Sequence, residues 1–238
     1  MKKLLILGGS SYLLPAIRAA HELGIYVITA DYLPDNIAHK YSDEYHNVSI
    51  IDKDAILQLA EDLQIDGIVS YATDPGVVVA AYVAEKLGLP TSPYESVKIL
   101  QNKGKFREFL RDNNFNVPYS ETFKEYSEVE LSKFKFPIIV KPVDSAGSKG
   151  VTRVDDETAL RAAFEYALKY SITGEVIIEE FIEKKGYSTD TDSFSIDGKL
   201  VLATFNDQCF DETANNPYTP AGYIYPCSMP VAWATFLT

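Results

Sequence analysis

One stretch of the chain, residues 136–151 with the sequence FPIIVKPVDSAGSKGV, restricts the possible folds more than any other. The apolar run Pro137–Val140 predicts the end of a buried strand. Lys141 stands where this strand stops, because Pro142 has no N–H to donate to a sheet and ends the pairing. Residues 151–154 return to an extended pattern. We therefore expect a hairpin whose two strands are joined by a loop of small residues.

The loop of this hairpin, called the flap below, has a composition that suits phosphate binding. It consists of Asp144, Ser145, Ala146, Gly147, Ser148, Lys149 and Gly150. Small residues let backbone N–H groups approach an anion, and the ammonium groups of Lys141 and Lys149 would neutralise it. The flap is not a Walker A motif, which needs G-x-x-x-x-G-K-[ST] running into a helix. From these residues alone, an ordinary surface hairpin that carries a lysine is an equally good interpretation.

Net charge, hydropathy and the spacing of cysteine and histidine exclude several classes of protein. The chain of 238 residues carries 34 acidic and 22 basic side chains, a net charge of −12, which argues against a general nucleic-acid binder. It has no run of about 18 or more apolar residues for a membrane span, and its first residues do not form a signal peptide. Cys209, Cys227 and the three histidines lack metal-site spacing. We therefore expect a cytoplasmic protein with no nucleic-acid or membrane partner.

The amino-terminal part of the chain alternates strands and helices. It predicts a strand at Lys2–Leu7, a turn at Gly8–Ser11, a helix at Tyr12–Leu23 and a strand at Ile25–Ala30. Further strands are expected at 45–50 and 67–71, and further helices at 54–63 and 75–87. Asp74 before Pro75 is typical of a helix N-cap. Short strands that alternate with helices indicate a parallel, Rossmann-like α/β sheet.

The turn after the first strand leaves two ligand classes open. The dinucleotide fingerprint G-x-G-x-x-G fails, because Ser10 and Leu13 occupy its second and third glycine positions. Asp31 does end the second strand, where an acid that binds ribose would lie. A Rossmann-type NAD-binding oxidoreductase that uses Gly8, Gly9 and Asp31 is therefore the alternative function. The simpler interpretation is a scaffold whose first turn faces another small ligand.

The Pro-rich segment Leu89–Pro93 predicts a domain boundary, with one domain at 1–92 and a second at 93–238. The second would contain a small lobe at about 119–185. Its expected helices lie at 96–110, 127–134 and 156–170, and a short strand is expected near Thr122. Residues 187–196 and 199–206 predict a hairpin around Asp197-Gly198.

Two adjacent carboxylates follow the apolar strand Val176–Ile178. Glu179 and Glu180 interrupt this strand, and burying them is costly unless they are paired. We expect them to face lysines or the amino group of a ligand.

In their order along the chain, these features resemble the ATP-grasp superfamily. The resemblance covers nearly the whole chain: the β-α-β amino-terminal part, Asn102-Lys103, the strand that ends at Lys141-Pro142, the flap, the strand 176–182 and the Asp197-Gly198 hairpin. The carbamoyl-phosphate-synthase-like and phosphoribosylamine-ligase-like branches are the most similar. The resemblance implies a Rossmann-like parallel-sheet pre-ATP-grasp domain, followed by an α+β ATP-grasp domain that is incomplete here.

The resemblance also implies a ligand and a reaction. ATP with Mg²⁺ would bind, a carboxylate would be activated as an acyl phosphate, and an amine or similar nucleophile would displace phosphate. A homodimer is compatible with this family. The residues that match the nucleotide site are Lys103, Lys141, Ser145, Gly147, Ser148, Lys149, Gly150, Glu179, Glu180, Phe181, Ile182 and Glu183. We expect the small carboxylate substrate at the amino-terminal turn and the segment after the fourth strand, at Gly9, Ser10, Ser11 and Asp74.

The sequence departs from the family in two places. Gly186 occupies the position of the glutamate that holds ribose, for which Glu183 is a nearby substitute. The family's metal-binding carboxylates lie beyond Thr238, and residues 231–238 carry no charge. The expectation is therefore a truncated or frame-shifted chain with impaired turnover, or a non-catalytic nucleotide-binding remnant. Asp190, Asp192 and Asp207 are interpreted as structural or surface residues, and no metal ligand is assigned.

Overall fold

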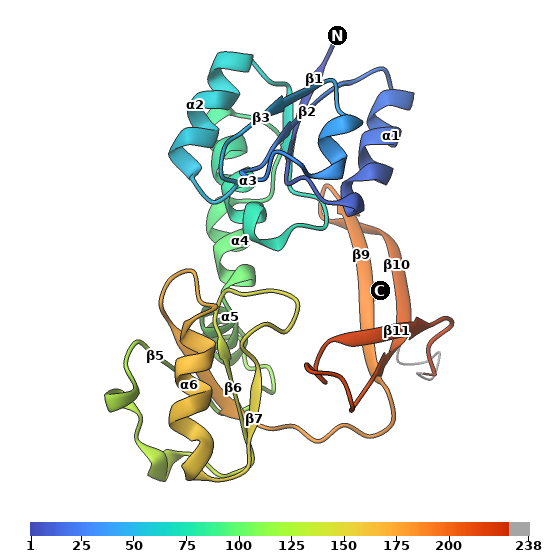
Figure 1. Cartoon of the computed structure of the whole chain (residues 1–238). Helices are drawn as coiled ribbons and strands as arrows, with labels where there is room; N and C mark the ends of the chain where they lie inside the picture. Colours follow the sequence, from blue (N-terminus) through green and yellow to red (C-terminus); the bar gives the residue numbers. More distant parts are fainter. Residues whose placement is uncertain (229–238) are drawn as a thin grey trace. The chain divides into compact units, whose positions relative to one another are not determined.

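The computed structural model describes residues 1–228, and the chain divides into two compact units (Figure 1). The first unit contains residues 1–117 and 143–146, and the second contains residues 118–142 and the chain from 147 onward. The domain boundary predicted at residue 92 stays a prediction. The expectation for residues 231–238 lies outside the described residues.

A parallel sheet forms the centre of the first unit. Its strands are β1 (Lys3–Leu7), β2 (Tyr26–Ala30), β3 (Glu44–His46) and β4 (Gly67–Val69), in the order β3-β2-β1-β4. Leu5 lies opposite Ile28 in β2 and opposite Ile68 in β4, so β1 is paired on both edges. The predicted α/β sheet is therefore confirmed, with β3 and β4 shorter than expected.

Helices cover both faces of this sheet (Figure 1). Leu5 and Leu7 pack with residues of α2 (Lys53–Leu63) and α3 (Asp74–Leu87) in one core. Ile6, between them, points to the other face and packs with residues of α1 (Leu14–Glu22) and with the 3₁₀ turn Ile37–Lys40. This alternation is the period-two pattern of a strand that is buried on both sides.

The helix expected at 96–110 is two helices. They are α4 (Tyr94–Gln101) and α5 (Lys103–Asp112), and the residue between them, Asn102, is extended with φ −96° and ψ 114°. The Asn102 side chain accepts a hydrogen bond from the Lys105 N–H at 3.0 Å, so it caps α5. A continuous helix was the wrong prediction because asparagine competes with helical hydrogen bonding and favours an N-cap.

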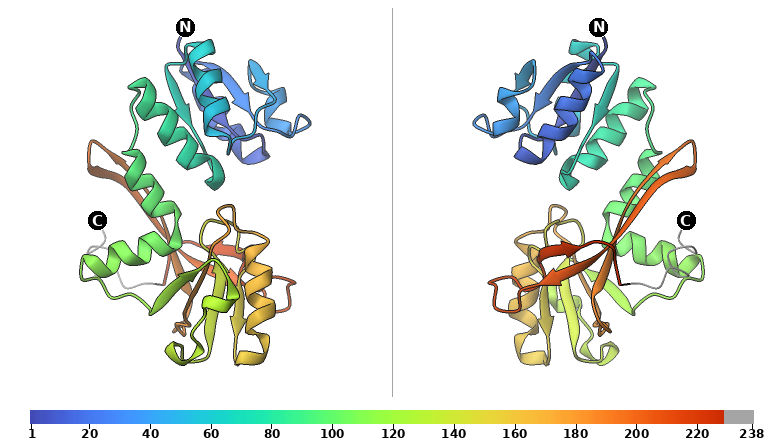
Figure 2. Two further views of the ribbon diagram at one scale, coloured as in Figure 1. Left: turned by 90° about the vertical axis from the view of Figure 1, so that its left-hand side faces the viewer. Right: turned by 90° about the vertical axis from the view of Figure 1, so that its right-hand side faces the viewer.

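The second unit begins with an antiparallel sheet. Its order is β5 (Ser120–Phe123), β8 (Val176–Glu180), β6 (Ile138–Pro142) and β7 (Thr152–Val154). Helix α6 (Leu160–Leu168) lies along one face of this sheet (Figure 2). Its Phe164 shares a core with Ile138 and Val140. The hairpin expected around the flap is confirmed as β6 and β7. Lys141 lies next to the last residue of β6, and pairing ends at Pro142 as expected.

Two expected helices of the second unit are shorter than predicted. Residues 127–134 form two 3₁₀ turns, Tyr126–Glu128 and Leu131–Lys133, because Val129 and Glu130 between them are extended. The helix expected at 156–170 begins with a 3₁₀ turn at Glu157–Ala159 and continues as α6.

A third sheet follows in the same unit. It has the order β11-β10-β9 and consists of β9 (Ser188–Ile196), β10 (Lys199–Phe210) and β11 (Pro220–Ile224). Asp197 and Gly198 join β9 to β10 with φ values of 50° and 74°, so the predicted hairpin is confirmed. Among the helices of residues 1–228, none combines the length and apolar character needed to cross a bilayer.

Candidate functional site

Lys141 and Glu179 meet on the face of the β5-β8-β6-β7 sheet that α6 does not cover. Val140 lies opposite Ile178 and both belong to the α6 core, so their neighbours in sequence, Lys141 and Glu179, point to the other face. The Lys141 ammonium donates to the Glu179 carboxylate, and their side chains are only 16% and 7% exposed. The expectation that a buried carboxylate faces a lysine is confirmed for Glu179. Glu180 is exposed instead.

The first part of the flap is fixed by Lys103 within the first unit. The Lys103 backbone N–H donates to the Val143 carbonyl, and its ammonium donates to the Ser145 carbonyl, both at 2.8 Å. Lys103 is the first residue of α5, directly after its N-cap Asn102. The cap therefore sets the position from which the Lys103 side chain reaches the flap.

The second part of the flap is held by contacts within the second unit. Gly147, Ser148 and Gly150 have φ values of 64°, 54° and 74°, in the left-handed region. A Cβ on Gly150 would lie 3.1 Å from Pro142 Cδ and 3.2 Å from Ala167 Cα, so only glycine fits there. Lys149 between them is exposed. The flap thus presents small residues and one ammonium group to solvent.

The segment after β8 is open to a ligand. The Phe181 N–H donates to the Pro137 carbonyl at 3.4 Å, and the Arg153 guanidinium lies 4.5 Å from the centre of the Phe181 ring. Ile182 is 67% exposed and Glu183 is also exposed. Among the described residues, the backbone groups of Ile182 and Glu183 have no hydrogen-bond partner. Free backbone groups of this kind are able to bind the edge of a planar base.

Three residues near this site were not predicted from the sequence. They are Arg153, which stacks on Phe181, and Asn216 and Tyr218, which hydrogen-bond Ser148. Asn216-Pro217 indicates a turn, but no local signal tells which distant segment such a turn contacts.

In the first unit, the predicted substrate segments lie beside one another. β1 and β4 are neighbours, and the chain order reverses between them, which is where open α/β sheets bind ligands. A Cβ on Gly8 would lie 2.9 Å from Thr73 Oγ1, so the two loops are in contact. Asp74 and Ser11 are exposed, and Ser10 is partly exposed. Asp74 was wrongly expected as the N-cap of α3: the N-cap is Thr73, and Asp74 lies in the first turn.

The geometry of the same turn does not suit a dinucleotide. Asp31 is buried, and its carboxylate accepts hydrogen bonds from the Leu33 N–H at 2.9 Å and from Asn36 Nδ2 at 3.3 Å. Even a Cβ on Gly9 would lie 2.6 Å from Asn36 Cβ and from His39 Nε2. The 32–39 loop therefore covers the glycine where a pyrophosphate would approach, and Asp31 is used to hold that loop.

A metal site is not built by the described residues. Within residues 1–228, no three His, Cys, Asp or Glu side chains gather closely enough to hold a metal ion. Asp190 and Asp192 lie in β9, whereas Asp207 is buried in β10. One Asp207 oxygen accepts from the Ser228 N–H at 2.8 Å, and the other has no partner among the described residues. These carboxylates do not fit a magnesium site.

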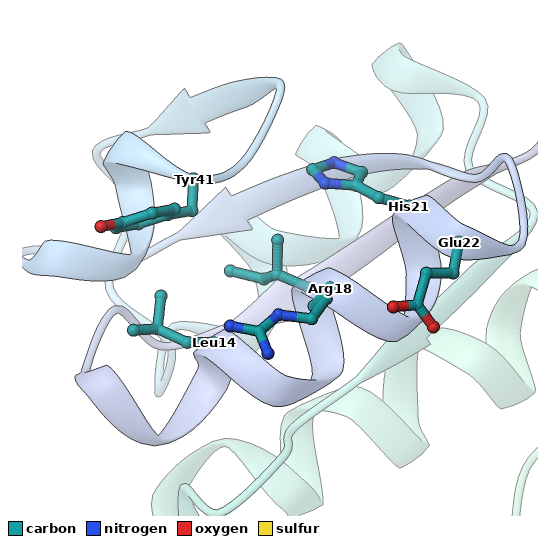
Figure 3. A pocket seen from close by; sticks show the side chains of 6 residues that line it. Leu14, Arg18, His21, Glu22 and Tyr41 are labelled. Atoms are coloured by element: carbon teal, nitrogen blue, oxygen red, sulfur yellow. The ribbon is translucent and has the colours of Figure 1, made fainter.

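A separate hollow of about 560 Å³ lies on the first unit, between α1 and Tyr41 (Figure 3). Its lining consists of Leu14, Ile17, Arg18, His21, Glu22 and Tyr41. It contains none of the predicted site residues. His21 is instead engaged with Asp43, whose carboxylate lies 3.0 Å from the His21 ring nitrogen.

Comparison with solved structures supports the fold. The L-amino acid ligase of Bacillus licheniformis aligns at a TM-score of 0.76 with 23% identity, covering 100% of this chain and 57% of the ligase. The N5-carboxyaminoimidazole synthetase of Staphylococcus aureus, complexed with ADP, aligns at 0.77 with 20% identity, covering 99% and 61%.

Comparison with curated proteins gives relatives of somewhat higher sequence identity. Formate-dependent phosphoribosylglycinamide formyltransferases of Rhodococcus jostii (strain RHA1) and Burkholderia vietnamiensis (strain G4 / LMG 22486) are 26% and 28% identical over 211 and 192 residues. Each match covers 76% of this chain and 46% of the relative, so the chain spans about half the length of these relatives.

Family models match both parts of the chain. Residues 17–91 match the ATP-grasp N-terminal domain, and residues 100–230, more than half of the chain, match the ATP-grasp domain. No comparison supports the alternative of an NAD-dependent oxidoreductase. The expected family is confirmed: the chain belongs to the ATP-grasp family.

Proposed function

We propose that this chain binds ATP through the flap, Lys141 and the segment after β8. One observation supports this proposal most directly. On the face of the second unit's sheet that α6 does not cover, Lys141 is paired with Glu179 at the end of the strand that leads into the glycine-rich flap. An ammonium group and a loop of small residues at one end of a hairpin are suited to phosphates. Family membership supports the same ligand.

The individual roles follow from what each group offers. Lys141 and Lys149 would neutralise phosphate charge, and Ser145, Gly147, Ser148 and Gly150 would supply backbone contacts from the flap. Lys103 would hold the first part of the flap through the Ser145 carbonyl. The exposed backbone of Ile182, next to Phe181, would meet the adenine edge. Glu180 and Glu183 are exposed carboxylates on the same segment and would accept hydrogen bonds from the amino or hydroxyl groups of the nucleoside.

The reaction we propose is carboxylate activation followed by ligation. A carboxylate oxygen of the substrate attacks the γ-phosphorus, the bond to the bridging oxygen breaks, and ADP leaves with an acyl phosphate formed. An amine then attacks the acyl carbon, inorganic phosphate leaves, and the amine loses a proton. The positive charges of the flap would stabilise the negative charge that spreads over the transferring phosphoryl group. No step is assigned to Mg²⁺, because the described residues do not build a site for it.

We propose that the substrate of this reaction binds at the loops that follow β1 and β4. Gly9, Ser10 and Ser11 belong to the first loop, and Thr73 and Asp74 follow β4 at the start of α3. Gly9 itself is buried, but the hydroxyl groups of Ser10 and Ser11 suit a small polar molecule that carries a carboxylate. The relatives' names point the same way, since they are ligases and transferases of small molecules.

Thermal unfolding with and without ATP tests the nucleotide proposal. Binding to the native state alone should stabilise the chain by about 2.7 kcal/mol at an ATP concentration of 100 times Kd. Lys149→Ala should reduce the ATP-induced shift and leave the unliganded melting temperature unchanged, because Lys149 is exposed. Lys135→Ala is the matched control, since Lys135 is also exposed and has no ion pair among the described residues. A shift with NAD and none with ATP would overturn the proposal.

A further inference from the structure

Two loops of the second unit that are far apart in sequence are joined at Ser148. Asn216 Nδ2 donates to the Ser148 carbonyl at 2.9 Å, and Ser148 Oγ donates to the Tyr218 carbonyl at 2.8 Å. Asn216 and Tyr218 belong to residues 211–219, which connect β10 to β11 and are called the 211–219 loop here. The flap is therefore tied to this loop through both the backbone and the side chain of one residue.

Ser148 needs such support because of its backbone. Its φ of 54° is in the left-handed region, which costs a residue with a Cβ about 1–2 kcal/mol. Gly147 before it has a φ of 64° and faces open space on the side where a Cβ would point. The Val151 N–H also donates to the Ser148 carbonyl at 3.3 Å. The two hydrogen bonds from the 211–219 loop add to this bond and favour the same conformation.

The 211–219 loop is itself ordered by short-range hydrogen bonds. Asn216 Oδ1 accepts from the Tyr218 N–H at 3.1 Å, which fixes the amide plane and directs Nδ2 to the flap. The Thr219 N–H donates to the Asn216 carbonyl at 3.3 Å. At the start of the loop, Asp211 Oδ1 accepts from the N–H and the hydroxyl of Thr213 at 2.8 and 2.6 Å. Asn216 is thus held in place before it contacts the flap.

We propose that Asn216 is a positioning residue for nucleotide binding. It holds Ser148 in the left-handed conformation, and this orients the flap's N–H groups and Lys149 for the phosphates. Asn216 acts through Ser148 and does not itself touch the nucleotide. The inference rests on the proposed ATP function of the flap, but the tie between the two loops is measurable without ATP.

Limited trypsin digestion measures how well the hydrogen bonds between Ser148 and the 211–219 loop order the flap, because Lys149 is an exposed cleavage site inside the flap. The fragment that begins at Gly150 is quantified by mass spectrometry in native conditions. Asn216→Ala should increase the rate of cleavage after Lys149 about fivefold, the effect of losing one hydrogen bond. The control is Asn215→Ala, which changes the preceding, exposed asparagine of the same loop. Equal cleavage rates in Asn216→Ala and Asn215→Ala would overturn the inference.

Two variants of Ser148 distinguish the effect of its hydrogen bond to the Tyr218 carbonyl from the effect of its left-handed backbone. Ser148→Ala removes the bond to the Tyr218 carbonyl and keeps the strain, whereas Ser148→Gly removes both. We expect faster cleavage after Lys149 in Ser148→Ala than in Ser148→Gly, with both variants folded at the temperature of the assay. Faster cleavage in Ser148→Gly than in Ser148→Ala would contradict the claim that hydrogen bonds keep Ser148 in its left-handed conformation.

The affinity for ATP tests whether the tie matters for function. Asn216→Ala should raise the Kd for ATP about fivefold, because part of the binding free energy must then be used to order the flap. Asn215→Ala should leave the Kd unchanged. The two claims can be rejected separately.

If ATP does not slow cleavage after Lys149 in the wild type, but Asn216→Ala still increases the cleavage rate, then the flap does not bind ATP, although the contact between the two loops is confirmed. If ATP does slow cleavage after Lys149, but Asn216→Ala has the Kd of the wild type, then the flap binds ATP and Asn216 does not position it.

Discussion

The ammonium of Lys141 donates a hydrogen bond to the carboxylate of Glu179 across two antiparallel strands, and both side chains are largely buried. Each charge is stable there because of the other. A residue proposed to bind phosphate is therefore also part of the fold. A loss of ATP binding on mutation of Lys141 consequently has two explanations, which the first prediction separates.

Lys141→Ala should destabilise the chain by about 3 kcal/mol, because it removes the ammonium group that pairs with the buried Glu179 carboxylate. The double variant Lys141→Ala/Glu179→Gln should recover part of this loss, since the remaining side chain is then neutral. Urea unfolding of the wild type and the two variants measures both effects. A Lys141→Ala variant as stable as the wild type would show that Glu179 finds another partner.

Gly147 and Gly150 should differ in their tolerance of alanine. Gly147→Ala should cost about 1 kcal/mol, because φ is 64° but no atom lies near the added Cβ. Gly150→Ala should cost about 3 kcal/mol, since it adds close contacts with Pro142 and Ala167 to the same backbone strain. Denaturant unfolding of the pair checks the ranking, and equal losses would contradict the packing around Gly150.

Asn102→Ala should destabilise the chain by about 1 kcal/mol through loss of the cap on α5. Asn102→Asp should preserve stability, because a carboxylate accepts the same hydrogen bond from the Lys105 N–H. Thermal unfolding measures these effects. If the Lys103 contacts with the flap depend on the cap, the ATP-induced stabilisation should fall in Asn102→Ala and be retained in Asn102→Asp.

Asp43 should give a pH-dependent contribution to stability. The hydrogen bond from the Val27 N–H, and then the one from His21, lower the pKa of Asp43 below its ordinary value, although partial desolvation opposes this. A lowered folded-state pKa stabilises the fold above the ordinary Asp pKa of about 3.9, and this contribution is lost as the pH falls through the folded-state value. Asp43→Asn should therefore be less stable than the wild type at neutral pH.

The difference between Asp43→Asn and the wild type should shrink as the pH falls below about 4, because the wild-type carboxyl is then protonated too. Urea unfolding at a series of pH values measures it. Asp35→Asn is the control, since Asp35 is exposed and has no ion pair or hydrogen bond among the described residues. A constant difference across the pH range would contradict the role of the Asp43 charge.

Much of the fold could be predicted because its signals are local. Gly8–Ser11 ends a buried strand, and Asp197-Gly198 joins two alternating strands. The Gly/Ser composition and the proline at position 142 likewise defined the flap within a few residues. In each case one short segment contains the whole signal.

The remaining features depend on contacts that the sequence does not contain. The Lys141–Glu179 pair requires the register of β6 against β8, and the contact between Ser148 and Asn216 spans 68 positions. The break at Asn102 was missed because a single capping residue interrupts an otherwise helical pattern. Local patterns thus located the flap, whereas tertiary contacts determine how it is held.

The 32–39 loop over Gly9 has a consequence for protein engineering. Restoring the missing glycines at positions 10 and 13 would not turn this unit into a dinucleotide-binding domain, because Asn36 and His39 would still occupy the approach to the turn. A redesign for NAD would have to shorten the loop first and release the Asp31 carboxylate from Leu33 and Asn36. Cofactor choice in this scaffold is thus limited by the 32–39 loop more than by the glycine motif.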